Sequence, residues 1–86
     1  MPHFALTRQG YDQLVKAYGG SPPSPLWVNA GVLSPSELSG LRAQGLEVTD
    51  FARAIPLQGS GLVDAIYAIE VHHPGLSIWV EHVGQP

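Results

Sequence analysis

This chain of 86 residues contains three apolar runs that are predicted to be strands, and polar side chains lie at or after the end of each. These side chains include groups that can bind ligands or transfer protons. Asn29 comes after the first run, Asp50 near the end of the second and Glu81 near the end of the third. Because the carboxyl ends of parallel strands meet at one edge of a sheet, where open sheets bind ligands, these side chains are expected to share a rim. The predicted ligand-binding residues on this rim are Asn29, Gly31, Ser34, Asp50, Arg53, Glu81 and His82.

Anion binding is one chemistry that this rim suggests, because Gly31 leads into a helix that Ser34 is expected to cap. A helix N-terminus offers free N–H groups and the positive end of the helix dipole. However, a single glycine falls far short of the glycine patterns of dinucleotide- and phosphate-binding loops. Ser34 and Glu37 would also compete with a ligand for the same N–H groups, and the charge of Glu37 repels phosphate. A well-capped helix is therefore the favoured interpretation.

Acid–base catalysis on this rim would need Asp50, Glu81 and His82 within hydrogen-bond reach of one another. Successive residues of a regular strand point to opposite faces, so Glu81 and His82 do not face the same pocket. The chain also lacks the Gly-x-Ser-x-Gly pattern of a hydrolase nucleophile, and Ser60 is predicted to cap a helix. We therefore assign no catalytic residue, and a non-catalytic role is favoured over an enzymatic one.

The residue pattern does not support a metal or cofactor site. The chain contains no cysteine, which excludes thiol catalysis and cysteine-ligated metals. His72 and His73 are adjacent, whereas chelation from one helix face requires ligands four residues apart. Their place in the last turn of a predicted helix suits the negative end of the helix dipole. No metal and no cofactor is predicted.

The elements that must position these side chains begin with a predicted helix over 7–18. Four apolar residues recur on one helical face, namely Tyr11, Leu14, Val15 and Tyr18. Thr7 is the expected N-cap, and Gly10 weakens the helix by about 1 kcal/mol. Residues 19–25 contain two glycines and three prolines, which predicts a linker.

The segment 26–83 is predicted to fold as a β-α-β-α-β unit. Its strands are expected at 26–30, 46–51 and 76–83, and its helices after Ser34 and over 60–72. The helix after Ser34 has the strongest local signals, because Ser34 and Glu37 form a capping box with proline between them. Gly45 is expected to end that helix, with Leu41 and Leu46 in contact across its end.

Helical patterns that alternate with apolar strands indicate crossover connections and parallel pairing. We therefore predict an α/β fold with a three-stranded parallel sheet, two crossover helices and an extra N-terminal helix. Strand order 2-1-3 puts the acidic strand 46–51 at an edge, and order 3-2-1 is the alternative. The arrangement resembles half of a Rossmann or flavodoxin-like sheet, which is a likeness of fold and implies no function.

Composition limits the classes of partner. The net charge of −3 disfavours nucleic-acid binding, which requires a basic surface. The apolar stretches are too short for a transmembrane helix, and the start of the chain shows no signal peptide, so a cytoplasmic location is expected. A length of 86 residues favours a single domain over 1–86 with a thin core, which self-association would help to stabilise.

These observations favour a small non-catalytic interaction or self-association module as the function. The expected partner is a second copy of the chain or another protein, reached through the amphipathic helix 7–18. The alternative is a binder of a small anion or nucleotide-like ligand, or an enzyme, that uses the rim at the carboxyl ends of the strands.

Overall fold

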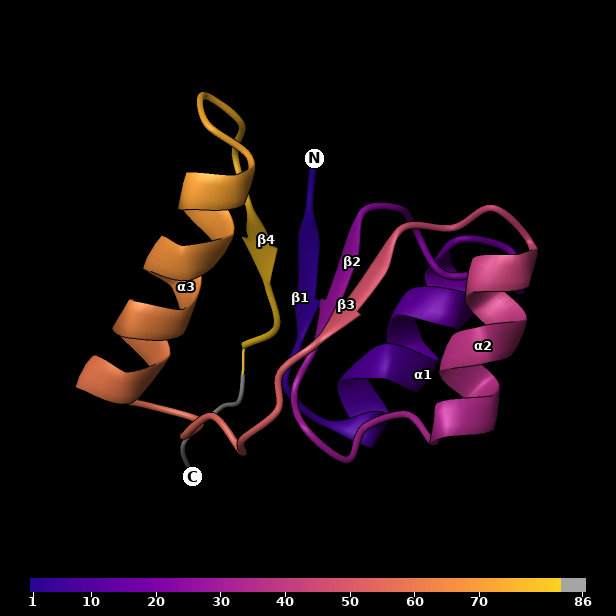
Figure 1. Cartoon of the computed structure of the whole chain (residues 1–86), viewed down its shortest axis with the longest axis horizontal. Coiled ribbons are helices and arrows are strands. Elements are labelled where there is room, and N and C mark those ends of the chain that lie inside the picture. Colours follow the sequence, from indigo (N-terminus) through magenta and orange to yellow (C-terminus); the bar gives the residue numbers. More distant parts are fainter. Residues whose placement is uncertain (83–86) are drawn as a thin grey trace.

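The computed structural model describes residues 1–82, which form a four-stranded parallel sheet with helices on both faces (Figure 1). In chain order the elements are β1 (His3–Ala5), α1 (Arg8–Ala17), β2 (Leu26–Val28), α2 (Pro35–Ala43), β3 (Val48–Asp50), α3 (Ser60–His72) and β4 (Trp79–Val80). The strand order is β3-β2-β1-β4, and every neighbouring pair is parallel. Helices α1 and α2 cover one face of the sheet, and α3 covers the other.

The prediction of a parallel α/β sheet is confirmed, but the predicted number of strands is wrong. Strand β1 was missed, and it lies between β2 and β4. The three predicted strands keep the order 2-1-3 with β1 inserted between the first and the third, and the alternative order 3-2-1 is wrong. The acidic strand β3 does lie at an edge, next to β2. Strand β1 has only three residues, too few for hydrophobic periodicity to be read. The predicted last strand ran to Val83, which lies outside the described residues.

Helix α1 packs against its own sheet and is part of the core. Thr7 is its N-cap, as predicted, and the Thr7 hydroxyl accepts a hydrogen bond from the Gly10 N–H at 3.0 Å. Tyr11 and Leu14 on its apolar face are buried in the cluster between the helices and the sheet. Residues 19–25, predicted as a linker, form the loop from α1 to β2.

Helix α2 has both of the ends that the sequence predicts. The Ser34 hydroxyl accepts from the Glu37 N–H at 3.2 Å, and the Glu37 carboxylate accepts from the Ser34 N–H at 2.9 Å. At the other end Gly45 has a φ of +87°, a value that glycine adopts without steric strain. The Leu46 N–H then donates to the Leu41 carbonyl at 3.2 Å, which completes the expected Schellman motif.

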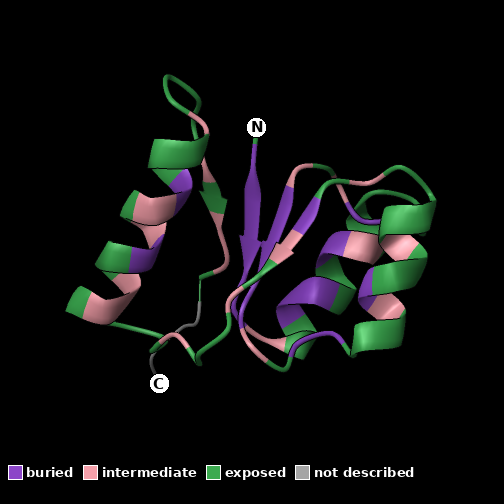
Figure 2. Ribbon diagram, viewed as in Figure 1, coloured by how far each residue is buried: buried purple, intermediate pink, exposed green. Residues whose placement is uncertain are grey.

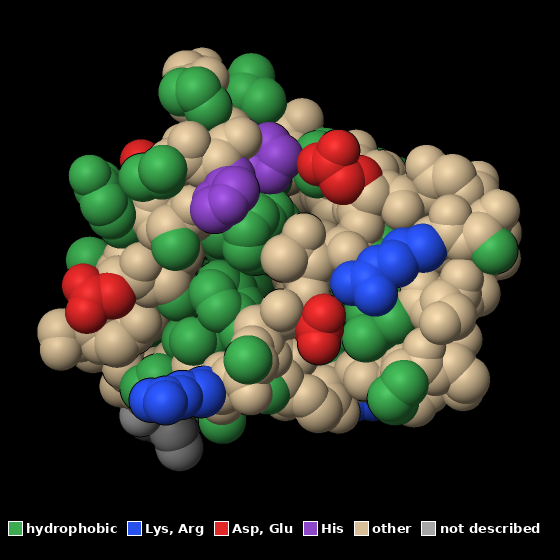
Figure 3. Space-filling view, in the orientation of Figure 1, with side chains coloured by type: hydrophobic (Ala, Val, Ile, Leu, Met, Phe, Trp, Pro, Cys, Tyr) green, Lys and Arg blue, Asp and Glu red, His purple; other side chains and the backbone are tan. Residues whose placement is uncertain are grey.

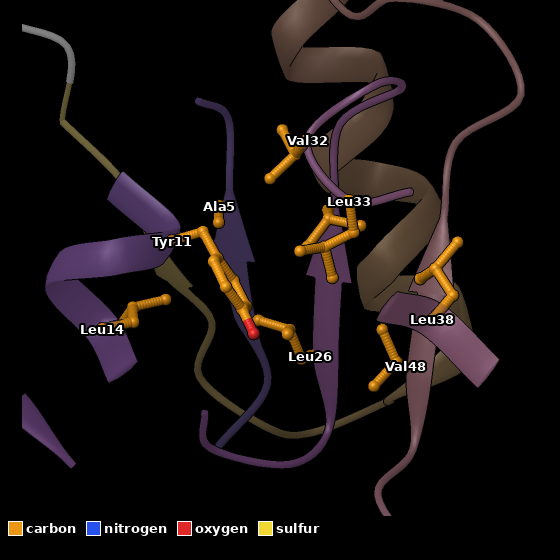
Figure 4. Close-up of a cluster of buried hydrophobic side chains, with 9 residues drawn as sticks. Ala5, Tyr11, Leu14, Leu26, Val32, Leu33, Leu38 and Val48 are labelled. Carbon is orange, nitrogen blue, oxygen red and sulfur yellow. The ribbon is translucent and has the colours of Figure 1, made fainter. Parts of the chain in front are cut away.

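Two hydrophobic clusters lie on the two faces of the sheet. The cluster under α1 and α2 draws on alternate strand residues and on both helices (Figure 4). Its buried members are Ala5, Tyr11, Leu14, Leu26, Val28, Val32, Leu33, Leu38 and Val48. The cluster under α3 is smaller, and its buried members are Phe4, Leu6, Trp27, Ala65 and Ile69.

Among the described residues, helix α3 is the only helix on its face of the sheet, and little of it is buried (Figure 2). Only Ala65 and Ile69 of its 13 residues are fully buried. Its N-cap is Gly59, with no side-chain hydrogen bond, so the prediction that Ser60 caps this helix is wrong. Ser60 is instead the first residue of the helix, because Gly59 takes the non-helical cap position with a φ of +84°. Among residues 1–82 no helix is long and apolar enough to cross a membrane.

Candidate functional site

The carboxyl ends of the strands lie at one edge of the sheet, at the bottom of Figure 1. The strand order reverses between β1 and β4, because the chain runs from β1 outward to β3 and then crosses back to β4. In open parallel sheets a ligand binds at such a reversal, beside the N-terminus of the first helix. Three of the predicted residues belong to this edge: Asn29 follows β2, Asp50 ends β3 and Glu81 follows β4.

The Glu81 carboxylate occupies the N-terminus of α1. Its Oε1 accepts from the Leu6 N–H at 2.7 Å and from the Thr7 N–H at 2.9 Å. Its Oε2 accepts from the Thr7 hydroxyl at 2.6 Å. A carboxylate is stabilised there by free N–H groups and by the positive end of the helix dipole. The position that would suit an anionic ligand is therefore filled by a side chain of the protein itself.

Gly10 makes this close approach possible. A Cβ atom at Gly10 would overlap the carboxyl group of Glu81, which lies against the first turn of α1. Glycine in a helix costs about 1 kcal/mol relative to alanine, and here that cost allows the Glu81 hydrogen bonds to form. The sequence pattern showed Gly10 only as a weak point of the helix, because the partner that explains it lies 71 residues further along the chain.

Asn29 uses the whole hydrogen-bonding capacity of its buried amide. Its Oδ1 accepts from the Ala30 N–H at 2.8 Å and from the Ile55 N–H at 2.7 Å. Its Nδ2 donates to the Leu6 carbonyl at 3.2 Å and to the Ile55 carbonyl at 3.0 Å. One side chain thus joins the ends of β1 and β2 to the loop that leads to α3. Its contacts account for its burial, because a buried amide must be hydrogen-bonded.

The other predicted rim residues do not converge on one point. Asp50 pairs with Arg42 of α2 at 3.4 Å, and both side chains are about half exposed. Arg53 and His82 are exposed, and no hydrogen bond or ion pair joins either to the rest of the rim within residues 1–82. Gly31 forms a turn with a φ of +80°.

Ser34 and Glu37 form the capping box and also connect two helices. Arg8 of α1 pairs with the Glu37 carboxylate at 2.9 Å and with Asp12 at 3.1 Å. The backbone hydrogen bond from Ser34, reinforced by the Arg8 guanidinium, lowers the pKa of Glu37 below its usual value. The same pairing raises the pKa of Arg8. The Ser34 and Glu37 N–H groups are thereby engaged within the protein.

Asn29, Ser34 and Glu81 therefore hold strand ends and helix ends in place. Residues 1–82 form no pocket, and they contain no group of three or more His, Asp or Glu side chains placed to hold a metal ion. Ligand binding by this rim remains a prediction. Three of the predicted rim residues have a structural role, because Asn29, Glu81 and Ser34 accept hydrogen bonds from backbone N–H groups that would otherwise lack partners.

A buried imidazole lies outside this rim, at the start of the sheet. His3 of β1 is 4% exposed and bonds to the Met1 carbonyl and the Tyr18 hydroxyl, each at 2.9 Å. The Met1 carbonyl can only accept, so Nδ1 carries the proton and Nε2 accepts from Tyr18. The pKa of His3 is lowered, mainly by burial of the imidazole. The hydrogen bond to the Met1 carbonyl acts in the opposite direction, and the charge of the N-terminus lowers the pKa further.

Folding stability should therefore depend on the protonation of His3. Because the pKa is lower in the folded chain than in the unfolded chain, the unfolded chain binds the proton more readily. The stabilisation of the fold by neutral His3 is complete above the pKa of the unfolded chain, about 6.5, and is lost as the pH falls below that value. We expect the free energy of unfolding to drop less between about pH 7.5 and pH 5 in His3→Gln than in the unmodified chain. Urea unfolding at both pH values measures this, and an equal drop in the two proteins would contradict it.

The adjacent histidines His72 and His73 have separate roles at the end of α3. His72 Nδ1 bonds to the Ala68 carbonyl at 2.9 Å, in agreement with the predicted role at the helix C-terminus. The Nε2 atom of His73 accepts from the indole N–H of Trp27 at 3.1 Å. The indole N–H of a largely buried tryptophan is thereby satisfied.

Comparison of the chain with family models, with curated proteins and with solved structures found no match.

Proposed function

We propose that this chain is a non-catalytic self-association module and that it binds a second copy through the outer face of α3. The observation that carries the proposal is a stripe of apolar side chains on that face. Val63, Tyr67 and Val71 are 63%, 67% and 59% exposed, and we refer to them as the α3 stripe. Figure 3 shows several hydrophobic side chains on this outer side of the molecule, at the left of the view, separated by backbone and polar atoms.

The spacing of the α3 stripe places its three residues on one side of the helix. Residues four apart in a helix lie about 40° apart around its axis, so Val63 and Val71 flank Tyr67 along one line. The inner face of α3 is apolar as well, since it buries Ala65 and Ile69. A surface helix normally has a polar outer face, whereas the outer face of α3 presents three apolar side chains beside the carboxylates of Asp64 and Glu70. The helix thus has the character of an element with a partner.

The predicted route to association was the apolar face of the helix at the start of the chain, and the structure gives that face another use. Tyr11 and Leu14 of α1 are buried against the sheet, so they do not reach a partner without unfolding. Helix α3 is the element that leaves a comparable apolar face free. Self-association by this chain is therefore assigned to α3.

The size of the α3 stripe sets the expected strength of association. Covering its three side chains and the atoms around them would bury about 500 Å² on each copy, against about 800 Å² for a standard stable interface. A contact of this size suits a weak and reversible complex with a dissociation constant on the order of 100 µM. The mass of the protein should therefore rise with concentration within a range that solution methods cover.

Replacing Tyr67 by lysine tests this function. We expect Tyr67→Lys to weaken association by at least about tenfold, because it places a charge at the centre of the apolar contact. Its free energy of unfolding should change by less than about 0.5 kcal/mol, since the side chain is mostly exposed. Sedimentation equilibrium over about 10 µM to 1 mM measures the association, and urea unfolding checks the fold.

The matched control is Leu57→Lys, which adds the same charge at an apolar side chain that is 40% exposed in the loop before α3. This control should associate like the unmodified chain. A monomeric mass for the unmodified chain throughout the concentration range would refute the proposed function. Equal weakening by the two lysine variants would show that added charge, and not the α3 stripe, governs the result.

A further inference from the structure

The side chain of His73 joins the end of α3 to the sheet through one ring nitrogen. His73 is the C-cap residue of α3, and its Nε2 accepts the hydrogen bond from the indole N–H of Trp27 in β2. Its Nδ1 has no hydrogen-bond partner among residues 1–82 and is open to solvent. A ring nitrogen that accepts carries no proton, so the imidazole is neutral and its proton is on Nδ1. A second proton must therefore bind to Nε2, the atom that faces Trp27.

A carboxylate lies beside the same nitrogen. The Oε2 atom of Glu47, the residue before β3, is 4.0 Å from Nε2 of His73. The backbone of Glu47 is held in place, because its N–H donates to the Ser24 hydroxyl and its carbonyl accepts from the Leu26 N–H. Its side chain is mostly exposed and free to turn. Figure 3 shows two histidine side chains next to each other beside the end of α3, with an acidic side chain close to them.

The other groups around His73 are compatible with a positive charge on its ring. Glu70 lies three residues earlier on α3, and the C-terminal end of a helix dipole is negative. The ring of His72 bonds to the Ala68 carbonyl and so has a separate partner. Strand β2 and residues 74–78, which follow α3, contain no charged side chain. The contact that a charged His73 would lose is therefore the one with Trp27.

Protonation of His73 turns that contact from favourable to unfavourable. Nε2–H and the indole N–H would both be donors, and neither could accept from the other. Trp27 is 7% exposed, so its N–H would need water as a new acceptor. Water can reach it when the end of α3 moves away from β2. Ala65 and Ile69, the fully buried residues of α3, lie before its last turn, so that turn can move while the rest of the helix stays packed.

We propose that His73 is a pH switch that exchanges the indole N–H of Trp27 for the Glu47 carboxylate and releases the last turn of α3 from the sheet. Histidine is the side chain that ordinarily changes its charge between about pH 5 and pH 8. The proton comes from solvent and returns to solvent when the pH rises, so the switch is reversible. It acts within one chain and does not depend on self-association.

NMR of the full-length chain tests the switch, because the indole N–H of Trp27 gives its own ¹H–¹⁵N signal. The chain has two tryptophans, and comparison with Trp79→Phe identifies the signal of Trp27. Between about pH 7.5 and pH 5 we expect this signal to move in one reversible step toward the position of a water-exposed indole. The backbone signals of residues 70–73 should move with it, and those of α2 should keep their positions.

Three variants show which side chain is responsible. In His73→Gln the signal should stay at its hydrogen-bonded position at every pH, because the amide oxygen accepts but does not take up a proton in this range. The matched control His72→Gln should titrate like the unmodified chain, although its ring also lies against Trp27. In Glu47→Gln the step should move to lower pH, because the charged ring loses its new partner.

Each of the other results would overturn the proposal. A Trp27 signal that does not move in the unmodified chain would show that the hydrogen bond survives or that His73 does not titrate in this range. A step that persists in His73→Gln or disappears in His72→Gln would assign it to another group. An unchanged step in Glu47→Gln would contradict the exchange of partners. Simultaneous loss of all native signals would show that acid unfolds the whole chain and that no local switch exists.

Discussion

Replacing Asn29 by alanine should cost about 3 to 4 kcal/mol of folding free energy, a large part of the total for a domain of this size. The change removes four hydrogen bonds, two to backbone N–H groups and two to backbone carbonyls. Each backbone group left unsatisfied in a buried place costs about 1 kcal/mol or more, and water entering the space recovers part of it. Urea unfolding followed by tryptophan fluorescence measures the difference.

A second amide provides the control for this prediction. Gln58 is exposed, so Gln58→Ala should change the free energy of unfolding by less than about 0.5 kcal/mol. Asn29→Asp separates the two halves of the amide, because it keeps the acceptor for the N–H groups of Ala30 and Ile55 but loses both donors. It should destabilise the chain as well, since a carboxylate oxygen then faces two carbonyl oxygens. A loss of less than about 1 kcal/mol in Asn29→Ala would show that the loop around Ile55 does not depend on this side chain.

The local signals of α2 predicted that helix well because they need no distant partner. Its capping box, its proline and its terminal glycine act within a few residues of one another, and the structure contains all of them. Strand β1 was missed for the opposite reason. Its three residues are too few to show a period, and its place at the centre of the sheet depends on pairing with β2 and β4. The apolar run from Phe4 to Leu6 directly before the N-cap Thr7 was the signal that could have revealed it.

The candidate rim shows the same division between local and distant causes. The sequence placed Asn29, Asp50 and Glu81 at the strand ends, because a strand end can be located from its own residues. What each side chain contacts could not be predicted, since Asn29 bonds to Ile55 and Glu81 bonds to Thr7 at the other end of the chain. The burial and hydrogen bonds of His3 could not be predicted for a similar reason, because its partner Tyr18 was recognised only as an apolar position on a helix.

The residues of the α3 stripe are visible in the sequence, but their exposure is not. A helix with apolar residues on every side does not reveal which side meets the sheet. Ala65 and Ile69 proved to be the buried positions, and Tyr67 between them proved to be the most exposed of the large apolar side chains. Within residues 1–82 the sheet has a single helix on this face, so only the three-dimensional arrangement shows which residues of that helix stay exposed.

Substituting Gly10 by alanine should lower the free energy of unfolding when residue 81 is glutamate and raise it when residue 81 is alanine. In the unmodified chain the new methyl group would displace the Glu81 carboxylate from the N–H groups of Leu6 and Thr7. The loss of these charge-assisted bonds costs about 2 to 3 kcal/mol, and the better helix propensity of alanine returns about 1 kcal/mol. We therefore expect Gly10→Ala to destabilise the chain by about 1 to 2 kcal/mol.

In the Glu81→Ala background the same substitution should stabilise the chain by about 1 kcal/mol, because no carboxylate remains to be displaced. Glu81→Ala alone should cost about 2 to 3 kcal/mol, so the two positions are coupled by about the same amount. Urea unfolding of the four proteins of this double-mutant cycle gives the coupling energy. Glu81→Gln should cost less than Glu81→Ala, since its amide oxygen still accepts from both N–H groups. A destabilising effect of Gly10→Ala that persists in the Glu81→Ala background would mean that the glycine is required by something other than the carboxylate.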